Sequence, residues 1–153
     1  MAEHSALRLH FRYLGSNLES IYELEDFVRN CHAKIEDEVV FPAIRKSLES
    51  KFVEETVSRL EADHKLIDKI GDQIKQKTVE GDMDVLRKRI QLYSNTVLSH
   101  NASEESLLFD HWNVSEALES EATSGARKII EVFGVNRYFS ITGISEKFFA
   151  KVH

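Results

Sequence analysis

The sequence has little of the residues that build turns, short strands and crosslinks. It contains one proline, six glycines and one cysteine among 153 residues. A single cysteine excludes an internal disulfide framework, and so little proline and glycine leaves few turns for many short strands. These shortages favour one domain built from long helices.

Long apolar runs and an excess of basic charge are also missing. No apolar run approaches the roughly 18 residues of a membrane span, and no basic segment followed by an apolar one opens the chain. The formal net charge is −6, which argues against nucleic-acid binding through a broad basic surface. We therefore expect a cytoplasmic protein that binds neither membrane nor nucleic acid.

The sequence does have helical periodicity, in four segments within residues 1–112. Apolar residues recur at three- and four-residue intervals, as at Leu7, Phe11 and Leu14 in the first segment. Short connections make neighbouring segments antiparallel. We therefore predict an all-α fold whose first domain is an up-down-up-down four-helix bundle over residues 1–112.

Turn-forming residues separate the segments. Ser50 and Asp82 are expected to cap the third and fourth helices, and Ser16 with Glu19 is typical of a capping box at the second. Pro42 is expected to kink the second helix or to begin its end, because proline has no backbone N–H.

Residues 113–153 are expected to form a C-terminal helical extension that packs on the bundle, on a second copy or on another protein. A fifth helix is predicted from Asn113 to Phe133, with an interruption at Ser124-Gly125. The last twenty residues add three phenylalanines: Phe139, Phe148 and Phe149.

Histidines and glutamates fall on helix faces that should be apolar. At about 100° per residue, His32 and Glu36 point the same way as Ile35. His100 and Glu104 repeat this arrangement in the fourth helix. An isolated buried carboxylate is costly, whereas carboxylates that face imidazoles are what a divalent or trivalent cation needs.

The pattern occurs twice, as two copies of a helix pair. The segment that begins at His32 aligns without gaps on the segment that begins at His100, and Glu3-His4 aligns on Asp63-His64. Each copy supplies one lone histidine and one His-x-x-x-Glu pair. The layout predicts a two-metal site with six ligands: His4, His32, Glu36, His64, His100 and Glu104.

Helix geometry favours His4 over His10 in the first helix. Antiparallel residues at the same height lie equally far from the turn between them, so the midpoint of two ligands should fall on a turn. The midpoint of His4 and His32 is residue 18, beside a predicted turn, whereas that of His10 and His32 is residue 21, inside a helical stretch. His10 stays as a reserve ligand.

These histidines and carboxylates resemble those of the hemerythrin-like, or HHE cation-binding, family. The resemblance covers residues 2 to 112, and Asp63-His64 and His100-x-x-x-Glu104-Glu105 both match it. The most specific part is a stretch that resembles the family's His-x-x-x-Glu-Glu-x-x-Leu-Phe-Pro signature. In this chain it is His32-x-x-x-Glu36-Asp37-x-Val39-Val40-Phe41-Pro42-Ala43.

The resemblance implies an oxygen-bridged, non-haem di-iron centre inside the bundle. Matched by position, it implies that His4 and His32 bind one iron and that His64 and His100 bind the other. It also implies that Glu36 and Glu104 bridge the two irons. Zinc or manganese could occupy the same nitrogen and oxygen donors.

Two positions depart from the oxygen-carrying members of the family. Asp68 stands one turn after His64, where those proteins have a further histidine, and a carboxylate ligand there would favour oxidised iron over reversible oxygenation. Their last bridging carboxylate comes five residues after the fourth-helix histidine, where this chain has Glu105. Asp68 and Glu105 are therefore kept as further reserve ligands, and Glu104 and Glu105 stay alternatives.

Two functions follow from these expectations. The first is a di-iron protein that binds, senses or reacts with a small oxidant such as dioxygen, peroxide or nitric oxide, with turnover left open. The alternative is an iron- or oxygen-responsive regulatory interaction module without turnover. A purely structural bundle is disfavoured, because it leaves six inward polar groups without a purpose.

Overall fold

We describe residues 2–14, 17–111 and 115–144 in a computed structural model of the chain. The regular elements in these ranges are all helical. In chain order they are α1 (Ala2–Tyr13), α2 (Leu18–Phe27), η1 (Val28–His32), α3 (Ala33–Ile35), η2 (Glu36–Val40), α4 (Phe41–Ser47), α5 (Lys51–Glu80), α6 (Met83–Leu107), η3 (Phe109–His111), α7 (Glu116–Phe133) and α8 (Val135–Thr142).

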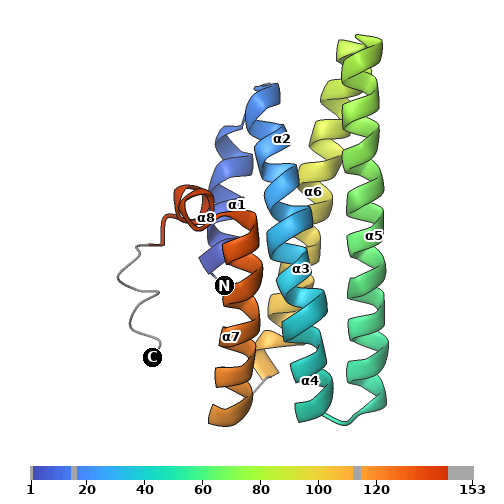
Figure 1. The fold of residues 1–153 in the computed structure, drawn as a ribbon. Coiled ribbons are helices and arrows are strands. Elements are labelled where there is room, and N and C mark those ends of the chain that lie inside the picture. The colour runs from blue at the N-terminus through green and yellow to red at the C-terminus, as the bar shows by residue number, and fades with distance from the viewer. Residues whose placement is uncertain (1, 15–16, 112–114, 145–153) are drawn as a thin grey trace.

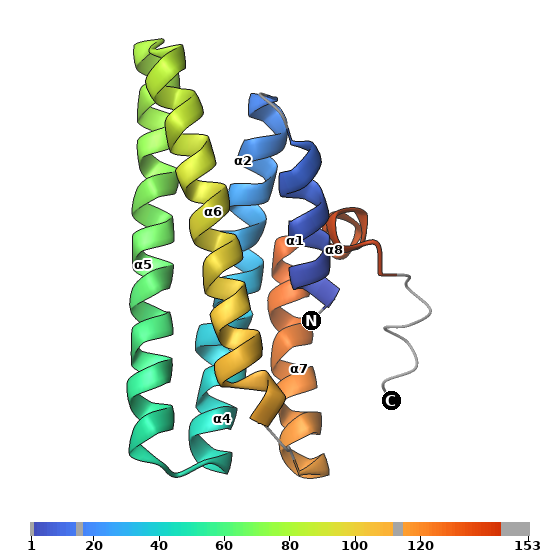
Figure 2. The same cartoon turned by 180° about the vertical axis from the view of Figure 1, so that it is seen from behind.

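Four antiparallel helices form the bundle (Figure 1). They are α1, the continuous helix from α2 to α4, α5 and α6. Seen from behind, α5 and α6 run beside each other and extend past the short α1 (Figure 2). The prediction of an all-α bundle is confirmed. Among the described helices none is both long and apolar enough to cross a bilayer.

Side-chain caps set the helix boundaries. Ser50 and Asp82 each accept a hydrogen bond from the N–H group three residues on, at the starts of α5 and α6 as predicted. Gly81 has a φ of 76°, the left-handed conformation that lets the chain reverse between these helices. The cap of α2 differs from the prediction: it is Asn17, whereas Ser16 lies outside the described residues.

The second bundle helix contains two π-helical turns, η1 and η2, which wind more widely than an α-helix. In η2 the N–H of Phe41 donates to the carbonyl of Glu36, five residues back. Pro42, which has no N–H to donate, follows this turn, and the helix continues to Ser47. The irregularity therefore precedes the proline and does not end the helix. It matters for function because His32 closes η1 and Glu36 opens η2.

The extension packs against the bundle. α7 lies along the second bundle helix, and α8 lies beside α1 (Figure 1). The predicted interruption at Gly125 was wrong, because α7 is continuous from its Ser115 cap to Phe133. A Cβ atom at Gly125 would lie 3.0 Å from a methyl carbon of Val39, so the glycine allows the two helices to approach closely. Besides Ser16, three residues named above fall outside the described ranges: Asn113, Phe148 and Phe149.

A polar layer crosses the interior between two apolar clusters. The larger cluster joins the bundle to the extension, since it includes both Ile67 of α5 and Ile129 of α7. The smaller cluster lies around α4 and comprises Phe41, Ile44, Val53, Val57, Leu60 and Leu108. On α5, His64 falls between Leu60 of the smaller cluster and Ile67 of the larger one. The predicted ligands thus have apolar side chains on both sides.

Candidate metal centre

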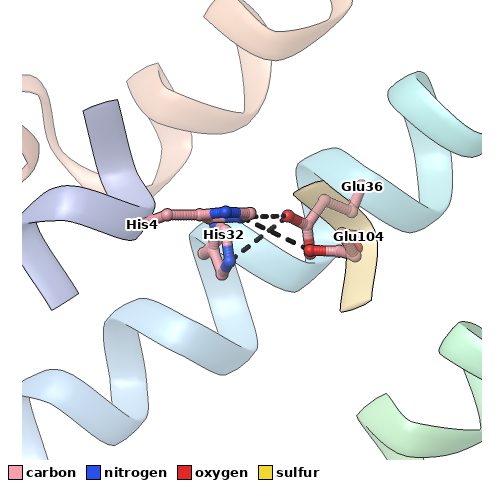
Figure 3. Close-up of side chains that lie close together, drawn as sticks. All are labelled: His4, His32, Glu36 and Glu104. Atoms are coloured by element: carbon pink, nitrogen blue, oxygen red, sulfur yellow. Dashed lines mark hydrogen bonds and ion pairs between the residues drawn. The ribbon is translucent and has the colours of Figure 1, made fainter. Parts of the chain in front are cut away.

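The six predicted ligands meet between the four bundle helices. All are buried, with exposed fractions from 0% for Glu104 to 5% for His64. They form two groups of four in which the potential ligand atoms lie within 4.8 Å of one another. The first group is His4, His32, Glu36 and Glu104, and the second is Glu36, His64, His100 and Glu104. Figure 3 shows the first group, with both imidazoles turned toward the carboxylates.

Glu36 belongs to both groups because it directs one oxygen to each. Its Oε1 lies 3.3 Å from His4 Nε2 and 3.2 Å from His32 Nε2. Its Oε2 lies 3.2 Å from His64 Nε2. The residue begins the π-helical turn η2, where the backbone changes its winding.

Glu104 divides its oxygens in the same way from the opposite helix. Its Oε2 lies 3.3 Å from His4 Nε2, and its Oε1 lies 3.3 Å from His100 Nε2. Two carboxylates that each face both groups have the arrangement needed to bridge two cations.

The donor atoms at the centre need positive charge. The Nε2 atoms of His64 and His100 lie 2.8 Å apart, and lone pairs aimed at one point repel unless a proton or cation lies between them. Five buried atoms of these six side chains have no hydrogen-bond partner within the described residues: His32 Nε2, Glu36 Oε2, Glu104 Oε1, Glu104 Oε2 and, on the outer side of its ring, His100 Nδ1. Burying a polar atom without a hydrogen-bond partner costs free energy of folding. The residues therefore fit two metal ions that accept imidazole and carboxylate ligands.

The second nitrogen of each imidazole, Nδ1, faces a further carboxylate. The distances from Nδ1 to oxygen are 2.7 Å for His32–Glu3, 2.8 Å for His64–Asp37, 2.9 Å for His4–Glu105 and 3.6 Å for His100–Asp63. The first three distances are hydrogen bonds, and a carboxylate that accepts from Nδ1 holds the proton there and leaves the Nε2 lone pair for a metal, whereas Asp63 only lies near His100. We call these four acids the outer carboxylates.

The outer carboxylates follow the internal repeat. Glu3 and Asp63 each precede a lone histidine in the sequence but face the histidine of a His-x-x-x-Glu pair. Asp37 and Glu105 each follow a shared glutamate and face the lone histidines. None of the four was predicted from the sequence to have this role. The signal was present, because an acid adjoins the same ligand in both copies of the repeat.

Burial and the nearby acids act in opposite directions on the imidazoles. Burial alone would lower the pKa of His4, but Glu104 and Glu36 outweigh it and raise the pKa to about 9. Burial also disfavours charge on His64, yet Asp37 and Glu36 raise its pKa to about 10. The negative surroundings therefore favour positive charge at the ring nitrogens, whether from a proton or from a metal ion.

Two reserve ligands have other partners. Glu105 pairs with His4 Nδ1 and with Arg8, at 2.9 Å each, so Glu104 is the glutamate that faces both groups. His10 Nε2 donates a hydrogen bond of 2.7 Å to the backbone carbonyl of Ile141 in α8. Neither Glu105 nor His10 belongs to the two groups.

Asp68, the third reserve ligand, also has another partner. It lies one turn after His64, but its carboxylate turns toward Arg29 of the second bundle helix, with Oδ1 3.3 Å from Nε. Arg29 also donates to the backbone carbonyl of Asp68 at 2.7 Å. Because Asp68 belongs to neither group, the structure gives no support to a ligand role or to the preference for oxidised iron inferred from it.

Comparison with known proteins connects this centre to one family. Residues 1–112 match the sequence model of a family described as hemerythrin HHE cation binding domain. No match was found among curated proteins or among solved structures. The matched residues include the four bundle helices and both ligand groups, but neither α7 nor α8.

Proposed function

The chain belongs to the hemerythrin HHE cation-binding domain family, and we propose that it holds a non-haem di-iron centre. The proposed role of this centre is to bind, sense or react with a small oxidant such as dioxygen, peroxide or nitric oxide. Bound iron would supply redox chemistry and a coordination position for the oxidant. Zinc or manganese would fit the same donors, but zinc would supply no redox chemistry.

The observation that carries the proposal is the division of the Glu36 and Glu104 oxygens between two pairs of imidazoles. A buried acid that served only to stabilise the fold would need a single cationic partner. Glu36 and Glu104 instead each direct one oxygen to one histidine pair and the other oxygen to the second pair. We assign His4 and His32 to one metal and the second histidine pair to the other, with both glutamates as bridges.

The rest of the chain prepares the centre in two ways. Three outer carboxylates accept from Nδ1 of His4, His32 and His64 and so orient these imidazoles with Nε2 free to bind a metal. The apolar clusters on both sides limit the entry of water, which strengthens electrostatic interactions in the layer between them.

Metal content tests the first half of the proposal. Protein expressed with ample iron and purified in air should contain two irons per chain and absorb in the near ultraviolet. Glu36→Ala should lower the binding of both metals, because both groups use this carboxylate. Glu25→Gln is a matched control, since Glu25 is a buried acid outside the groups that pairs with Arg29 and Lys75. Iron near zero in the wild type would overturn the proposal.

Reactivity tests the second half. The ferrous protein, prepared without air, should change its absorption spectrum within seconds when it is mixed with peroxide, dioxygen or nitric oxide. Repeated consumption of peroxide would identify an enzyme, whereas one spectral change per centre would identify a sensor or carrier. A ferrous centre that is inert to all three would contradict the proposed function.

One structural observation favours the regulatory alternative as a second candidate. The extension is part of the apolar core and also reaches one outer carboxylate, since Tyr138 of α8 donates to Glu3. A protein partner that bound only the metal-loaded form, and dissociated on chelation without any peroxide consumption, would support this alternative.

A further inference from the structure

The two ligand groups share one plan but differ in what supports their outer carboxylates. Around His4 and His32, each outer carboxylate has an additional donor: Arg8 for Glu105 and Tyr138 for Glu3. Around the second histidine pair, Asp37 and Asp63 have no such donor within the described residues. Both of these side chains are 38% exposed. The internal repeat therefore gives a symmetric set of ligands in asymmetric surroundings.

The tyrosine comes from the extension, outside the residues that match the family. Tyr138 is 5% exposed, and its hydroxyl donates to Glu3 Oε1 at 2.7 Å. The other oxygen of Glu3 accepts from His32 Nδ1, also at 2.7 Å. The Tyr138 ring packs near Phe27, which in turn stacks on the His32 ring with 15° between the planes. One α8 residue thus fixes both the outer carboxylate and the packing around His32.

Two further contacts hold α8 in place. His10 of α1 donates to the Ile141 carbonyl at 2.7 Å, and Arg137 of α8 pairs with Asp26 of α2 at 2.7 Å. α8 therefore bridges the first two bundle helices on the outside of the centre.

The Tyr138 hydroxyl also holds the first turn of α1 in place. Glu3 and His4 lie in the first turn of α1, which would be prone to fraying if nothing held it. The hydrogen bond from Tyr138 ties this turn to α8, 135 residues along the chain. This hydrogen bond therefore helps to hold both histidines of the first group in position. It acts on His32 through the outer carboxylate Glu3 and on His4 through the helical turn that carries it.

We propose that Tyr138 is a positioning residue for the metal bound by His4 and His32, and that it makes this metal the slower of the two to dissociate. The inference rests on the proposed function, because it assumes that both groups bind metal. A ligand whose outer partner is fixed by two donors is better oriented than one whose partner is exposed, and the loss of such a partner typically weakens metal affinity 10- to 100-fold.

Cobalt(II) provides a test that does not depend on activity. Wild-type protein loaded with two Co²⁺ per chain and mixed with excess EDTA should release cobalt in two phases of equal amplitude. Tyr138→Phe keeps the ring and removes the hydroxyl, and it should speed the slow phase on the order of tenfold while the fast phase stays within twofold. Glu3→Gln should also speed the slow phase, because an amide has no negative charge and only one acceptor oxygen, whereas Glu3 accepts from Tyr138 with one oxygen and from His32 with the other.

Two controls separate the hydroxyl from general loosening. Tyr93→Phe removes another buried hydroxyl, one without a hydrogen-bond partner in the described structure. Ile141→Val reduces the packing of α8 but keeps Tyr138. Both should release cobalt at wild-type rates.

Proton NMR of the Co²⁺ protein adds a readout that a structural role would not change. The imidazole N–H protons next to cobalt are shifted far from the other signals, and only the His32 signal should move strongly in Tyr138→Phe. One release phase in the wild type, an unchanged slow phase in Tyr138→Phe or equal changes in both phases would overturn the inference. Fewer than two Co²⁺ bound by the wild type would instead overturn the two-metal proposal.

Discussion

The two nitrogens of each imidazole at the centre have different surroundings. In His4, Nε2 faces the shared glutamates while Nδ1 faces Glu105. His64 repeats this, with Asp37 at Nδ1. In the proposed centre, Nδ1 would therefore keep its proton and Nε2 would bind the metal at a pH high enough for Nε2 to lose its proton.

Metal binding should therefore strengthen as the pH rises. Burial opposes charge on His4 and His64, but the surrounding carboxylates raise their pKa values to about 9 and about 10. Below these values a metal ion must displace a proton, so the apparent affinity should rise about tenfold per pH unit for each proton displaced. Competition of Co²⁺ with a chelator at pH 6, 7 and 8 measures this slope. A slope of zero would contradict proton displacement.

The two histidines of the first helix should respond differently to substitution. His4 faces both shared glutamates, whereas His10 donates to the Ile141 carbonyl. His4→Ala should bind one Co²⁺ per chain and His10→Ala should bind two, as measured by elemental analysis after gel filtration. The reverse result would show that His10, not His4, is the ligand from this helix.

At the scale of elements, the close packing of α7 on the second bundle helix depends on Gly125. Glycine normally weakens a helix by about 1 kcal/mol relative to alanine. Here it sits against Val39 of η2, where even a Cβ atom would approach a methyl carbon to 3.0 Å. The cost in helix propensity is thus offset by the contact that the small residue allows.

Gly125→Val should lower the free energy of unfolding by about 1 to 3 kcal/mol, because added methyl groups would overpack the contact. Urea denaturation at fixed metal content measures the change. Adding Val39→Ala should restore part of the loss by making room for the new side chain. Equal losses in the single and double variants would show that the strain lies elsewhere than at Val39.

At the scale of the whole molecule, the centre joins all four bundle helices to one another. Because the six predicted ligands come from α1, the helix from α2 to α4, α5 and α6, the groups exist only in the folded chain. Metal binding is therefore linked to folding, and metal should stabilise the bundle as a unit.

This stabilisation should be large. A metal present at a hundredfold of its Kd contributes about 2.7 kcal/mol per site, so two sites should raise the Tm by about 10 to 20 °C in a chain of this size. Circular dichroism melts with Co²⁺ and with EDTA measure the shift. Mg²⁺, which prefers oxygen ligands, is the control and should change the Tm little. Equal shifts with both ions, or with Co²⁺ added to Glu36→Ala, would contradict a specific imidazole site.

The sequence by itself determined the helices and the set of inward polar residues. The periodicity of apolar residues and the caps at Ser50 and Asp82 are local features, and a four-residue spacing places His32 with Glu36, and His100 with Glu104, on one helix face. The all-α bundle predicted from these features is confirmed, and so is the family that the His-x-x-x-Glu motifs resemble. The ligand roles stay predictions, although the structure brings all six side chains together.

Only the tertiary structure decided which partner each polar group meets. Helical periodicity fixes the direction of a side chain to within tens of degrees, so it could not separate Glu104 from Glu105 or show that Asp68 turns to Arg29. Nor could it connect Glu3 to Tyr138, 135 residues away. Such contacts depend on how each helix is rotated against its neighbours, and that rotation is set by the packing of the whole core.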